Sequence, residues 1–341
     1  METILLTGGT GYIGSHCCVK LLESGKKVII LDNLSNSKKE ILGRIKKISS
    51  KNPVFVEGDI CDKKILNKIF SEHHIDAVIH MAGLKAVGES TEKPLLYYKV
   101  NVEGSRHLIE ICELYKVSNF IFSSSATVYG SPDYLPLNEE HPLRPTNPYG
   151  ETKKIVEDIL KNVGNYNNNF NFAILRYFNP VGAHPSGLMG EDPNDTPNNL
   201  MPLISQVATG QRNHLNIYGD DYPTIDGTGV RDYIHVEDLV NAHILSLNHL
   251  LNEKDSIIVN LGTGRGYSVF EIVNAFSKAT GKKIPHKLCS RRAGDIPSSY
   301  TDPKKAKRLL GWCAEHGLKR ICDDQWRWCA QNALRNKKTP L

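Results

Sequence analysis

Tyr149 and Lys153 place a phenol and an ammonium four positions apart in the segment YGETK. On a helix, residues at i and i+4 lie on the same face, so both groups can reach one partner. A free tyrosine has a pKa of about 10 and is a poor base at neutral pH unless a nearby positive charge stabilises the phenolate. Lys153 can supply that charge and can also donate hydrogen bonds to a cofactor hydroxyl. Such pairs are common on exposed helices, so the meaning of this one depends on the rest of the chain.

A glycine-rich segment near the N-terminus provides that context. The apolar run 4–7 leads into GGTGYIG, in which Gly8, Gly11 and Gly14 fit the pattern G-x-x-G-x-x-G. Missing side chains permit a tight turn and let backbone N–H groups approach a pyrophosphate at a helix N-terminus. The next apolar run ends at Asp32, whose carboxylate can accept hydrogen bonds from ribose hydroxyls and would repel a 2′-phosphate. These features predict an NAD site and, with the tyrosine–lysine pair, the oxidation of an alcohol.

The ends of the next predicted strands supply further candidates. Small residues after a strand let a dinucleotide pass close to the backbone, and a lysine there can approach a phosphate or remain a surface residue. The candidates are Asp59 and Ile60 near adenine, then Met81, Ala82, Gly83 and Lys85.

A hydroxyl cluster, SSSAT from Ser123 to Thr127, follows the fifth predicted strand. One of its hydroxyls can bond to a substrate alcohol and orient it towards Tyr149, although serine clusters are also common in turns. With Tyr149 and Lys153 the cluster forms an acid–base set that moves a proton while hydride leaves carbon. Positioned proton transfer of this kind contributes about a hundred- to ten-thousandfold to a rate.

The first half of the chain alternates short β-rich apolar runs with amphipathic stretches. This alternation predicts βαβ units and a parallel sheet covered on both faces, with ligands beyond the carboxyl ends of the strands. The predicted strands are 4–7, 28–32, 54–57, 77–80, 119–123 and 172–176, and the predicted helices are 13–23, 63–71, 95–115 and 149–160.

The regular alternation of strand-like and helix-like segments ends after Asn179, because proline, glycine and asparagine become frequent through 180–202. A further strand at 257–262 and a helix at 269–278 follow. We therefore predict an α/β protein with a Rossmann-type doubly wound parallel sheet in 1–179. The remainder, 180–341, is predicted to form a smaller α/β substrate domain, with some segments returning to the first domain.

Composition excludes several classes of function. The 341 residues are 40% apolar and carry a formal charge of +5, without a basic block of the kind that binds nucleic acid. No apolar run approaches the roughly 20 residues that span a bilayer, and the N-terminus does not read as a signal peptide. Eight cysteines form no C-x-x-C pair and predict reduced thiols. We expect a cytoplasmic protein without a metal site.

Longer motifs follow one another along nearly the whole chain. They are TGGTGYIGSH from Thr7, HMAGLKAVGES from His80, SSSATVYG from Ser123, NPYGETK from Asn147, LRYFNPVGAHPSGLMGED from Leu175, PNNLMP from Pro197, DGTGVRDYIHVEDL from Asp226 and RRAGDIPSSY from Arg291. In these motifs the sequence resembles the extended short-chain dehydrogenase/reductase family and, within it, the UDP-glucose 4-epimerases.

The resemblance implies a redox-neutral cycle on a tightly held NAD. Tyr149 would take the proton of the sugar 4-hydroxyl while hydride passes from C4 to nicotinamide, and the 4-keto sugar would turn over before hydride returns to its other face. Ser125 matches the catalytic serine, and Thr127 is a supporting hydroxyl. Lys153 would lower the Tyr149 pKa and bind the nicotinamide ribose.

The resemblance also implies two sets of binding residues. The cofactor set is Gly8, Gly11, Tyr12, Ile13, Gly14, Asp32, Asn33, Asn36, Asp59, Ile60, Met81, Ala82, Gly83, Lys85, Asn101, Ser123, Tyr149, Lys153 and Tyr177. The UDP-sugar set is Lys85, Ser125, Thr127, Tyr149, Phe178, Asn179, Asn199, Leu200, Asn216, Tyr218, Arg231, Arg292, Asp295 and Ser299. The two arginines suit a diphosphate, because guanidinium groups form paired bonds to phosphate oxygens; the alternative is a surface salt bridge.

Ser299 departs from the pattern of some epimerases, which carry a bulky tyrosine at this position. A serine leaves room for an N-acetyl group at the sugar's C2, unless neighbouring side chains refill the space. We therefore expect turnover of both UDP-glucose/UDP-galactose and the N-acetylhexosamine pair.

Three rival functions are disfavoured. A nucleotide-sugar 4,6-dehydratase would carry an acidic residue after Thr127, where this chain has Val128. A net oxidoreductase would release NADH, and a non-catalytic NAD-binding scaffold predicts a damaged catalytic set. The resemblance further suggests a homodimer through the regions 95–115 and 149–160.

Overall fold

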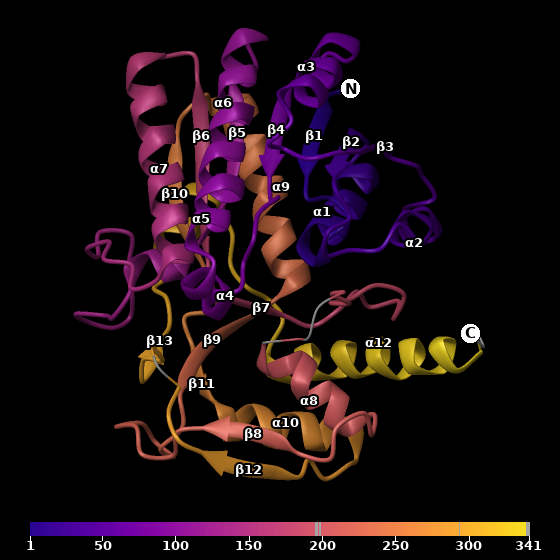
Figure 1. Cartoon of the computed structure of the whole chain (residues 1–341), viewed down its shortest axis with the longest axis vertical. Coiled ribbons are helices and arrows are strands. Elements are labelled where there is room, and N and C mark those ends of the chain that lie inside the picture. Colours follow the sequence, from indigo (N-terminus) through magenta and orange to yellow (C-terminus); the bar gives the residue numbers. More distant parts are fainter. Residues whose placement is uncertain (195–196, 198, 293, 339–341) are drawn as a thin grey trace.

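A seven-stranded parallel sheet forms one half of the molecule (Figure 1). The computed structural model describes residues 1–194, 197, 199–292 and 294–338, which include every predicted site residue. The strands are β1 (Thr3–Thr7), β2 (Lys27–Asp32), β3 (Val54–Glu57), β4 (Ala77–His80), β5 (Asn119–Ser125), β6 (Asn171–Tyr177) and β10 (Ile257–Leu261). Their order is β10-β6-β5-β4-β1-β2-β3, so the direction of winding reverses between β1 and β4. In folds of this kind, ligands bind at such a reversal. The predicted Rossmann-type fold is confirmed.

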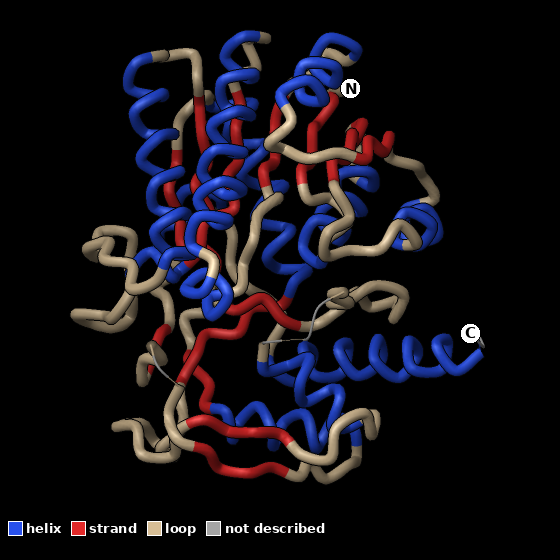
Figure 2. Tube along the Cα trace, viewed as in Figure 1, coloured by secondary structure: helices blue, strands red, loops and turns tan. Residues whose placement is uncertain are grey.

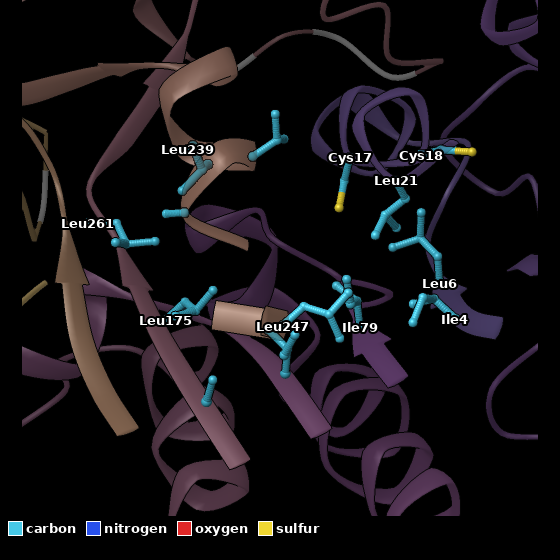
Figure 3. Close-up of a cluster of buried hydrophobic side chains, with 14 of the residues drawn as sticks. Ile4, Leu6, Cys17, Cys18, Leu21, Ile79, Leu175, Leu239, Leu247 and Leu261 are labelled. Carbon is cyan, nitrogen blue, oxygen red and sulfur yellow. The ribbon is translucent and has the colours of Figure 1, made fainter. Parts of the chain in front are cut away.

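Helices cover both faces of this sheet. Ile4 and Leu6 of β1 enter one core and Leu5 enters the other, because successive side chains of a strand point to opposite faces. Figure 3 shows the first core, with Leu21 and Leu239 from two helices facing strand residues. The first face carries α1 (Tyr12–Glu23), α2 (Ile41–Ser49), α9 (Val236–Glu253) and α11 (Lys304–Leu310); the second carries α3 (Lys63–Glu72), α6 (Gly104–Leu114) and α7 (Pro148–Tyr166).

Most of the second half of the chain forms a smaller α/β layer beyond the carboxyl ends of the sheet (Figure 2). Two short sheets lie there and pack with three helices around a separate core. The strands are β7 (Asn179–Val181), β8 (Leu215–Tyr218), β9 (Val230–His235), β11 (Gly266–Ser268), β12 (His286–Cys289) and β13 (Ser298–Ser299), and the helices are α8 (Leu200–Ala208), α10 (Val269–Thr280) and α12 (Leu318–Lys338).

The predicted continuous helix 95–115 is interrupted. After α4 (Val87–Glu92), the chain forms α5 (Pro94–Tyr97), a π-helical turn η1 (Tyr98–Glu103) and then α6. The π turn carries Asn101, whose amide is bonded to the backbone of a neighbouring loop. π-Helical turns within α-helices are frequently found at functional sites.

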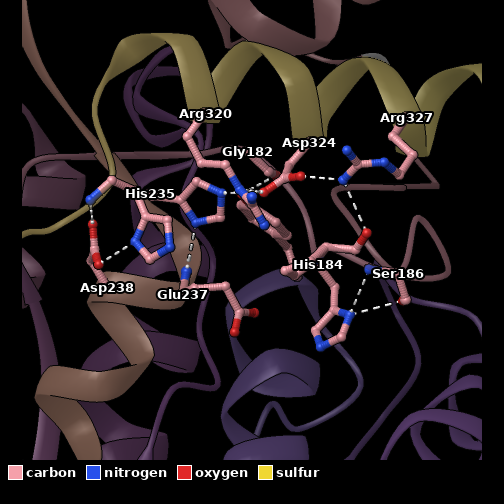
Figure 4. Close-up of polar contacts among 12 residues, drawn as sticks. Gly182, His184, Ser186, His235, Glu237, Asp238, Arg320, Asp324 and Arg327 are labelled. Atoms are coloured by element: carbon pink, nitrogen blue, oxygen red, sulfur yellow. Dashed lines mark hydrogen bonds and ion pairs between the residues drawn. The ribbon is translucent and has the colours of Figure 1, made fainter.

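The helix α12 is fixed by a buried polar cluster (Figure 4). Asp324 is fully buried and accepts hydrogen bonds from Arg320 Nε at 2.5 Å and from Arg327. Its carboxylate lies 3.4 Å from His235 Nε2 at the end of β9, and Arg327 also donates to the Pro185 carbonyl at 3.0 Å. These bonds join the helix to β9 and to the loop after β7. Among the described residues, no helix combines the length and apolar character needed to cross a membrane.

Candidate active site

The glycine turn between β1 and α1 has the shape of a phosphate cradle. Gly8 adopts a φ of +71°, and a Cβ there would lie 2.7 Å from the Ala82 nitrogen. A Cβ on Gly14 would lie 2.1 Å from the Gly8 carbonyl oxygen. The helix begins after Gly11, which has no side chain to cap its N–H groups. The turn therefore excludes side chains and leaves the helix N-terminus open to an anion, which fits the pyrophosphate of NAD.

The Asp32 carboxylate holds the loop that follows β2 through hydrogen bonds. Its Oδ2 accepts from the Thr10 N–H at 3.0 Å, and its Oδ1 accepts from the Leu34 N–H at 2.9 Å and from Ser37 Oγ at 3.3 Å. An ionised carboxylate offers about four lone-pair positions. Asp32 therefore holds the loop and retains capacity for a ribose hydroxyl. Next to it, Asn33 Nδ2 donates to Asp59 Oδ2 at 2.8 Å, which brings two predicted adenosine contacts together.

Ser125 and Tyr149 are the two residues that are predicted to transfer the proton. Ser125 is the last residue of β5, and its Oγ accepts from the Thr127 N–H at 3.2 Å and from Thr127 Oγ1 at 3.0 Å. With both lone pairs used, Ser125 keeps its own hydroxyl proton to donate. Burial raises the pKa of the Tyr149 phenol, and the Ser125 hydroxyl opposes that rise.

Lys153 lies one helical turn beyond Tyr149 on α7. Its Nζ donates to the Ser123 carbonyl at 2.8 Å and lies 5.9 Å from the centre of the Tyr149 ring. Burial lowers the pKa of Lys153 to about 8, while Glu157 opposes that shift. The sequence argument made Lys153 the group that lowers the Tyr149 pKa. In the structure the Ser125 hydroxyl also favours the phenolate, and the Lys153 ammonium donates to the Ser123 carbonyl; the effect of Lys153 on the Tyr149 pKa stays a prediction.

A buried ion pair positions the catalytic helix. Glu157 Oε2 lies 2.6 Å from Arg176 Nη2 of β6, and its Oε1 accepts from Ser124 Oγ at 2.6 Å. At the helix N-terminus, Asn147 accepts from the Gly150 N–H at 2.9 Å. Sequence reasoning missed these supporting residues, although a charged residue inside the otherwise apolar strand β6 was a signal.

Asn101, a predicted cofactor contact, is hydrogen-bonded to the loop after β4. Its Oδ1 accepts from the Leu84 N–H at 2.8 Å, and its Nδ2 donates to the Leu84 carbonyl at 3.0 Å and to Thr152 Oγ1 at 3.1 Å. Gly83 must be small here, because its Cβ would lie 3.0 Å from Asn101 Oδ1. Asn101 therefore shapes the path that Met81 and Ala82 line.

Glu191 engages two predicted ligand-binding residues. Its Oε1 lies 2.7 Å from Lys85 Nζ and 3.4 Å from Asn199 Nδ2. Nearby, the Asn194 N–H donates to Asn36 Oδ1 at 2.9 Å. The loop that contains Glu191 and Asn194 thus reaches from the end of β4 to the loop after β2.

Asn179, Arg231 and Ser299 come together on the small sheet around β9. Ser299 pairs in register with Arg231, and Asn179 pairs in register with Tyr233. Residues that are aligned across strands, or two apart along one strand, point to the same face. These side chains therefore share one face of the sheet, which agrees with the predicted sugar side.

The second arginine approaches from the loop after β12. Arg292 lies 5.2 Å from the ring centre of Tyr218, and its Nε donates to Asp295 Oδ2 at 2.9 Å. Burial raises the pKa of Tyr233 to about 12, and the charges of Arg231 and Arg292 oppose that rise. Both arginines therefore lie close to one phenol. Asn216 and Tyr218 are exposed on the same side of β8.

Several predicted residues direct their side chains into the protein. The Tyr12 hydroxyl donates to the Gly182 carbonyl at 2.6 Å, and Ile60 is buried beneath Gly104. Ile13 and Leu200 pack against hydrophobic cores, and Phe178 is buried. Where such residues meet a ligand, their backbone or an edge of the side chain would make the contact. In the described part of the chain, no group of three His, Cys, Asp or Glu residues is arranged to hold a metal ion.

Comparison with known proteins identifies the family. A family model described as the NAD dependent epimerase/dehydratase family matches residues 4–262. The UDP-glucose 4-epimerase of Bacillus subtilis (strain 168) is 54% identical over 329 residues, which cover 96% of this chain and 97% of that protein. The chain belongs to the NAD dependent epimerase/dehydratase family. The resemblance seen in the sequence motifs is confirmed.

Solved structures of this epimerase/dehydratase type superpose along nearly the whole chain. The UDP-glucose 4-epimerase from Stenotrophomonas maltophila, described with bound NAD and formylated UDP-arabinopyranose, has a TM-score of 0.96 and 47% identity, with 98% of this chain and 100% of that chain covered. The UDP-Glc/GlcNAc 4-epimerase of Campylobacter jejuni has a TM-score of 0.85 and 36% identity, with 97% and 100% covered.

Proposed function

We propose that this chain interconverts UDP-glucose and UDP-galactose by transient oxidation at C4 of the sugar. The chain is an NAD-dependent UDP-hexose 4-epimerase, and the observation that carries this reading is that Ser125 and the Lys153 contact to Ser123 lie at the carboxyl end of β5, the same edge of the sheet as the glycine turn after β1. When bound, NAD accepts a hydride from C4 and returns it, so no external oxidant is consumed.

Tyr149 moves the proton in this proposal. Its Oη takes the proton of the sugar 4-hydroxyl and returns it after the sugar has presented its other face. Ser125 retains a hydroxyl proton to donate to the same oxygen or to the phenolate, because Thr127 occupies its lone pairs. Lys153, fixed by the Ser123 carbonyl, carries its positive charge near the phenolate and contacts the cofactor ribose.

The nucleotide is held by the second half of the chain. Arg231 and Arg292 form charge-assisted bonds to the diphosphate. Asn216 and Tyr218, on the exposed side of β8, meet the uridine, and Asp295 meets its ribose. The 4-keto sugar turns over within the pocket while these groups retain the UDP moiety. Residues 1–179 thus serve mainly NAD and 180–341 mainly the UDP-sugar, with α9 and β10 of the second half packed into the first sheet.

Ser299 makes the N-acetylhexosamine pair a second substrate in this proposal. It lies beside Arg231 on the face that also carries Asn179, and a serine leaves space for a C2 N-acetyl group. The similar protein from C. jejuni is described as acting on UDP-Glc and UDP-GlcNAc. This likeness favours the broader specificity.

A homodimer formed through α5, α6 and α7 completes the proposal. Leu95 and Leu96 are 83% and 41% exposed on α5, and Tyr98 is 37% exposed at the start of η1. Apolar side chains gathered in this way mark interaction sites. Light scattering of the wild type and of Leu95→Asp tests the dimer, which the aspartate should dissociate. All eight cysteines are free thiols, which supports a cytoplasmic location.

The first experiment supplies the purified protein with UDP-galactose and, in a parallel reaction, with UDP-N-acetylgalactosamine. Formation of UDP-glucose without accumulation of NADH is the expected result and supports the internal redox cycle. Failure to invert either sugar although NAD is bound would overturn the epimerase assignment. Inversion of UDP-galactose alone would remove the proposal for Ser299.

A further inference from the structure

Residues 182–192, which follow β7 and are here called the strap, run between α1 and α12 (Figure 1). The strap is hydrogen-bonded to α1 at its start. Its middle is fixed by α12, because the Pro185 carbonyl accepts from Arg327 at 3.0 Å. In addition, Gly190 packs so closely on Trp328 that a Cβ there would lie 2.5 Å from the indole ring. The body of the strap is therefore held by two helices.

The tip of the strap, Glu191 and Asp192, is held by ion pairs. Glu191 Oε1 lies 2.7 Å from Lys85 Nζ, and Asp192 Oδ1 lies 3.2 Å from Lys38 Nζ. The side chains of Asp192 and Lys38 are 30% and 46% exposed. Ion pairs with this exposure are weak and break readily. The tip can therefore come away from its partners while the body of the strap stays in place.

The two lysines place the tip opposite the glycine turn. Lys85 follows β4 and Lys38 follows β2, and these two strands flank β1 in the sheet. All three strands are parallel, so the loops after them meet at one edge of the sheet, where adjacent strands are about 4.8 Å apart. A tip that contacts the loops on both sides of β1 therefore spans the end of β1, where the turn with Gly8 begins.

We propose that Asp192 is a positioning residue: by pairing with Lys38, it latches the strap across the cofactor and slows the release of NAD. This inference rests on the proposed function, because an internal redox cycle requires the reduced cofactor to stay bound until hydride returns to the sugar. Neither Asp192 nor Lys38 is among the predicted cofactor contacts. The pairing also neutralises a carboxylate that would otherwise repel the diphosphate of the cofactor.

The test measures how fast the protein releases NAD in the absence of sugar. The protein is loaded with radiolabelled NAD and chased with excess unlabelled NAD, and the label that stays on the protein is followed over time. Asp192→Lys separates a latch from a general effect of charge. Its added positive charge would by itself attract the cofactor diphosphate and slow release. Two facing lysines should instead open the latch and speed release by roughly two- to fivefold.

A reversed pair and a neighbouring pair are the controls. Lys38→Asp combined with Asp192→Lys restores an ion pair of opposite polarity and should return the release rate to within about twofold of the wild type. Glu57→Gln removes an exposed pair with Lys39, which does not involve the strap, and should leave release unchanged. Salt of about 1 M, at which the Debye length falls to about 3 Å, should reduce the difference between the wild type and Asp192→Lys.

Slower or unchanged release from Asp192→Lys, or fast release from the reversed pair, would overturn the latch. The measurement does not require the epimerase reaction, so a protein that holds NAD but inverts no sugar would lose the proposed function while the latch is still tested. A protein that takes up no NAD would overturn both.

Discussion

Two ion pairs in this molecule have similar N···O distances, but one pair is buried and the other is exposed to solvent. Arg176 and Glu157, behind the catalytic helix, lie 2.6 Å apart with side chains 3% and 0% exposed. Arg292 and Asp295, at the proposed nucleotide end, lie 2.9 Å apart with side chains 53% and 25% exposed. Breaking a buried pair leaves an uncompensated charge, whereas an exposed pair is worth about 0–1 kcal/mol. At the proposed catalytic end, breaking the ion pair would therefore cost much more free energy than at the proposed nucleotide end, where the pair can exchange partners.

The same contrast holds for the uncharged groups. Ser125, Lys153 and Tyr177 are each hydrogen-bonded to a partner within the protein. Lys85 and Asn199 both bind the Glu191 carboxylate. An anionic ligand that binds these two residues would have to compete with that carboxylate. Changes at the catalytic end should therefore lower turnover, and changes at the nucleotide end should alter substrate affinity.

The largest effect is expected for Tyr149→Phe, which removes the proton carrier. Turnover should fall by about a hundred- to ten-thousandfold, with UDP binding nearly unchanged. Steady-state kinetics and calorimetry with UDP check this. The control is Tyr134→Phe, which removes an exposed hydroxyl bonded to Asn138. A loss confined to KM would contradict the contrast between the two ends.

Arg292→Met should act on affinity. A hydrogen bond to a charged group contributes about 1.5–3 kcal/mol, so KM for the UDP-sugar should rise by roughly ten- to a hundredfold with little change in kcat. The matched control is the preceding residue, because Arg291 is engaged with Asp221 and stacks over Tyr222. Arg291→Gln should leave KM within about twofold of the wild type, as is usual for surface substitutions. An equal rise in both variants would remove Arg292 from the diphosphate site.

Ser299→Tyr should narrow the substrate range. Overpacking a tight site costs about 1–3 kcal/mol, so N-acetylhexosamine turnover should fall by roughly tenfold or more. UDP-galactose turnover should persist. Competition between the two sugars in one reaction measures the ratio directly. An unchanged ratio would show that other side chains determine the space near C2.

The pH profile should report Lys153. Below its pKa of about 8 the ammonium is charged, and it becomes neutral as the pH rises through that value. The ratio of wild-type turnover to that of Lys153→Arg, in which the ionisation of Tyr149 largely cancels, should therefore be constant on the acidic side and fall by up to about tenfold per pH unit above pH 8. Lys153→Arg, which stays charged, should lack this alkaline limb even at a lower rate. Persistence of the limb would assign it to another group.

The smallest effect is expected for Glu191→Gln. The pair with Lys85 has one side chain that is 52% exposed, and such pairs contribute about 1 kcal/mol or less. Releasing Lys85 should tighten binding of UDP by up to about fivefold. Fluorescence titration measures this, with Glu57→Gln as the control, because Glu57 pairs with Lys39 at the surface. Weaker binding would mean that Glu191 helps to hold the ligand.

The sequence predicted the first sheet well for a physical reason. Strands buried on both faces are continuous apolar runs, and the fully buried β4 has the predicted bounds 77–80. The second half gave weaker signals, because β7, β11 and β13 are only three, three and two residues long. The long helix α9 escaped prediction, since buried polar residues such as His243 and Ser246 interrupt its apolar pattern.

The residues of the candidate site likewise divide into those that the sequence could predict and those that it could not. Ser125, Tyr149 and Lys153 could be placed from the sequence, because strand ends and helix spacing are local properties. The contacts of Glu157, Arg176 and His243 could not, because they join elements that are distant in the chain. The bond from Lys153 to the Ser123 carbonyl could not be predicted either, because a four-residue spacing specifies a helix face but not the direction of an ammonium.

The cluster around Asp324 has a practical consequence for shortening or extending the chain. A version that ends before this residue would leave His235 without the carboxylate beside it and the loop at Pro185 without the Arg327 bond. The last helix therefore cannot be treated as a dispensable tail. Affinity tags and fusion partners belong after residue 338, because the described part of α12 beyond Arg327 leads away from the sheet (Figure 1).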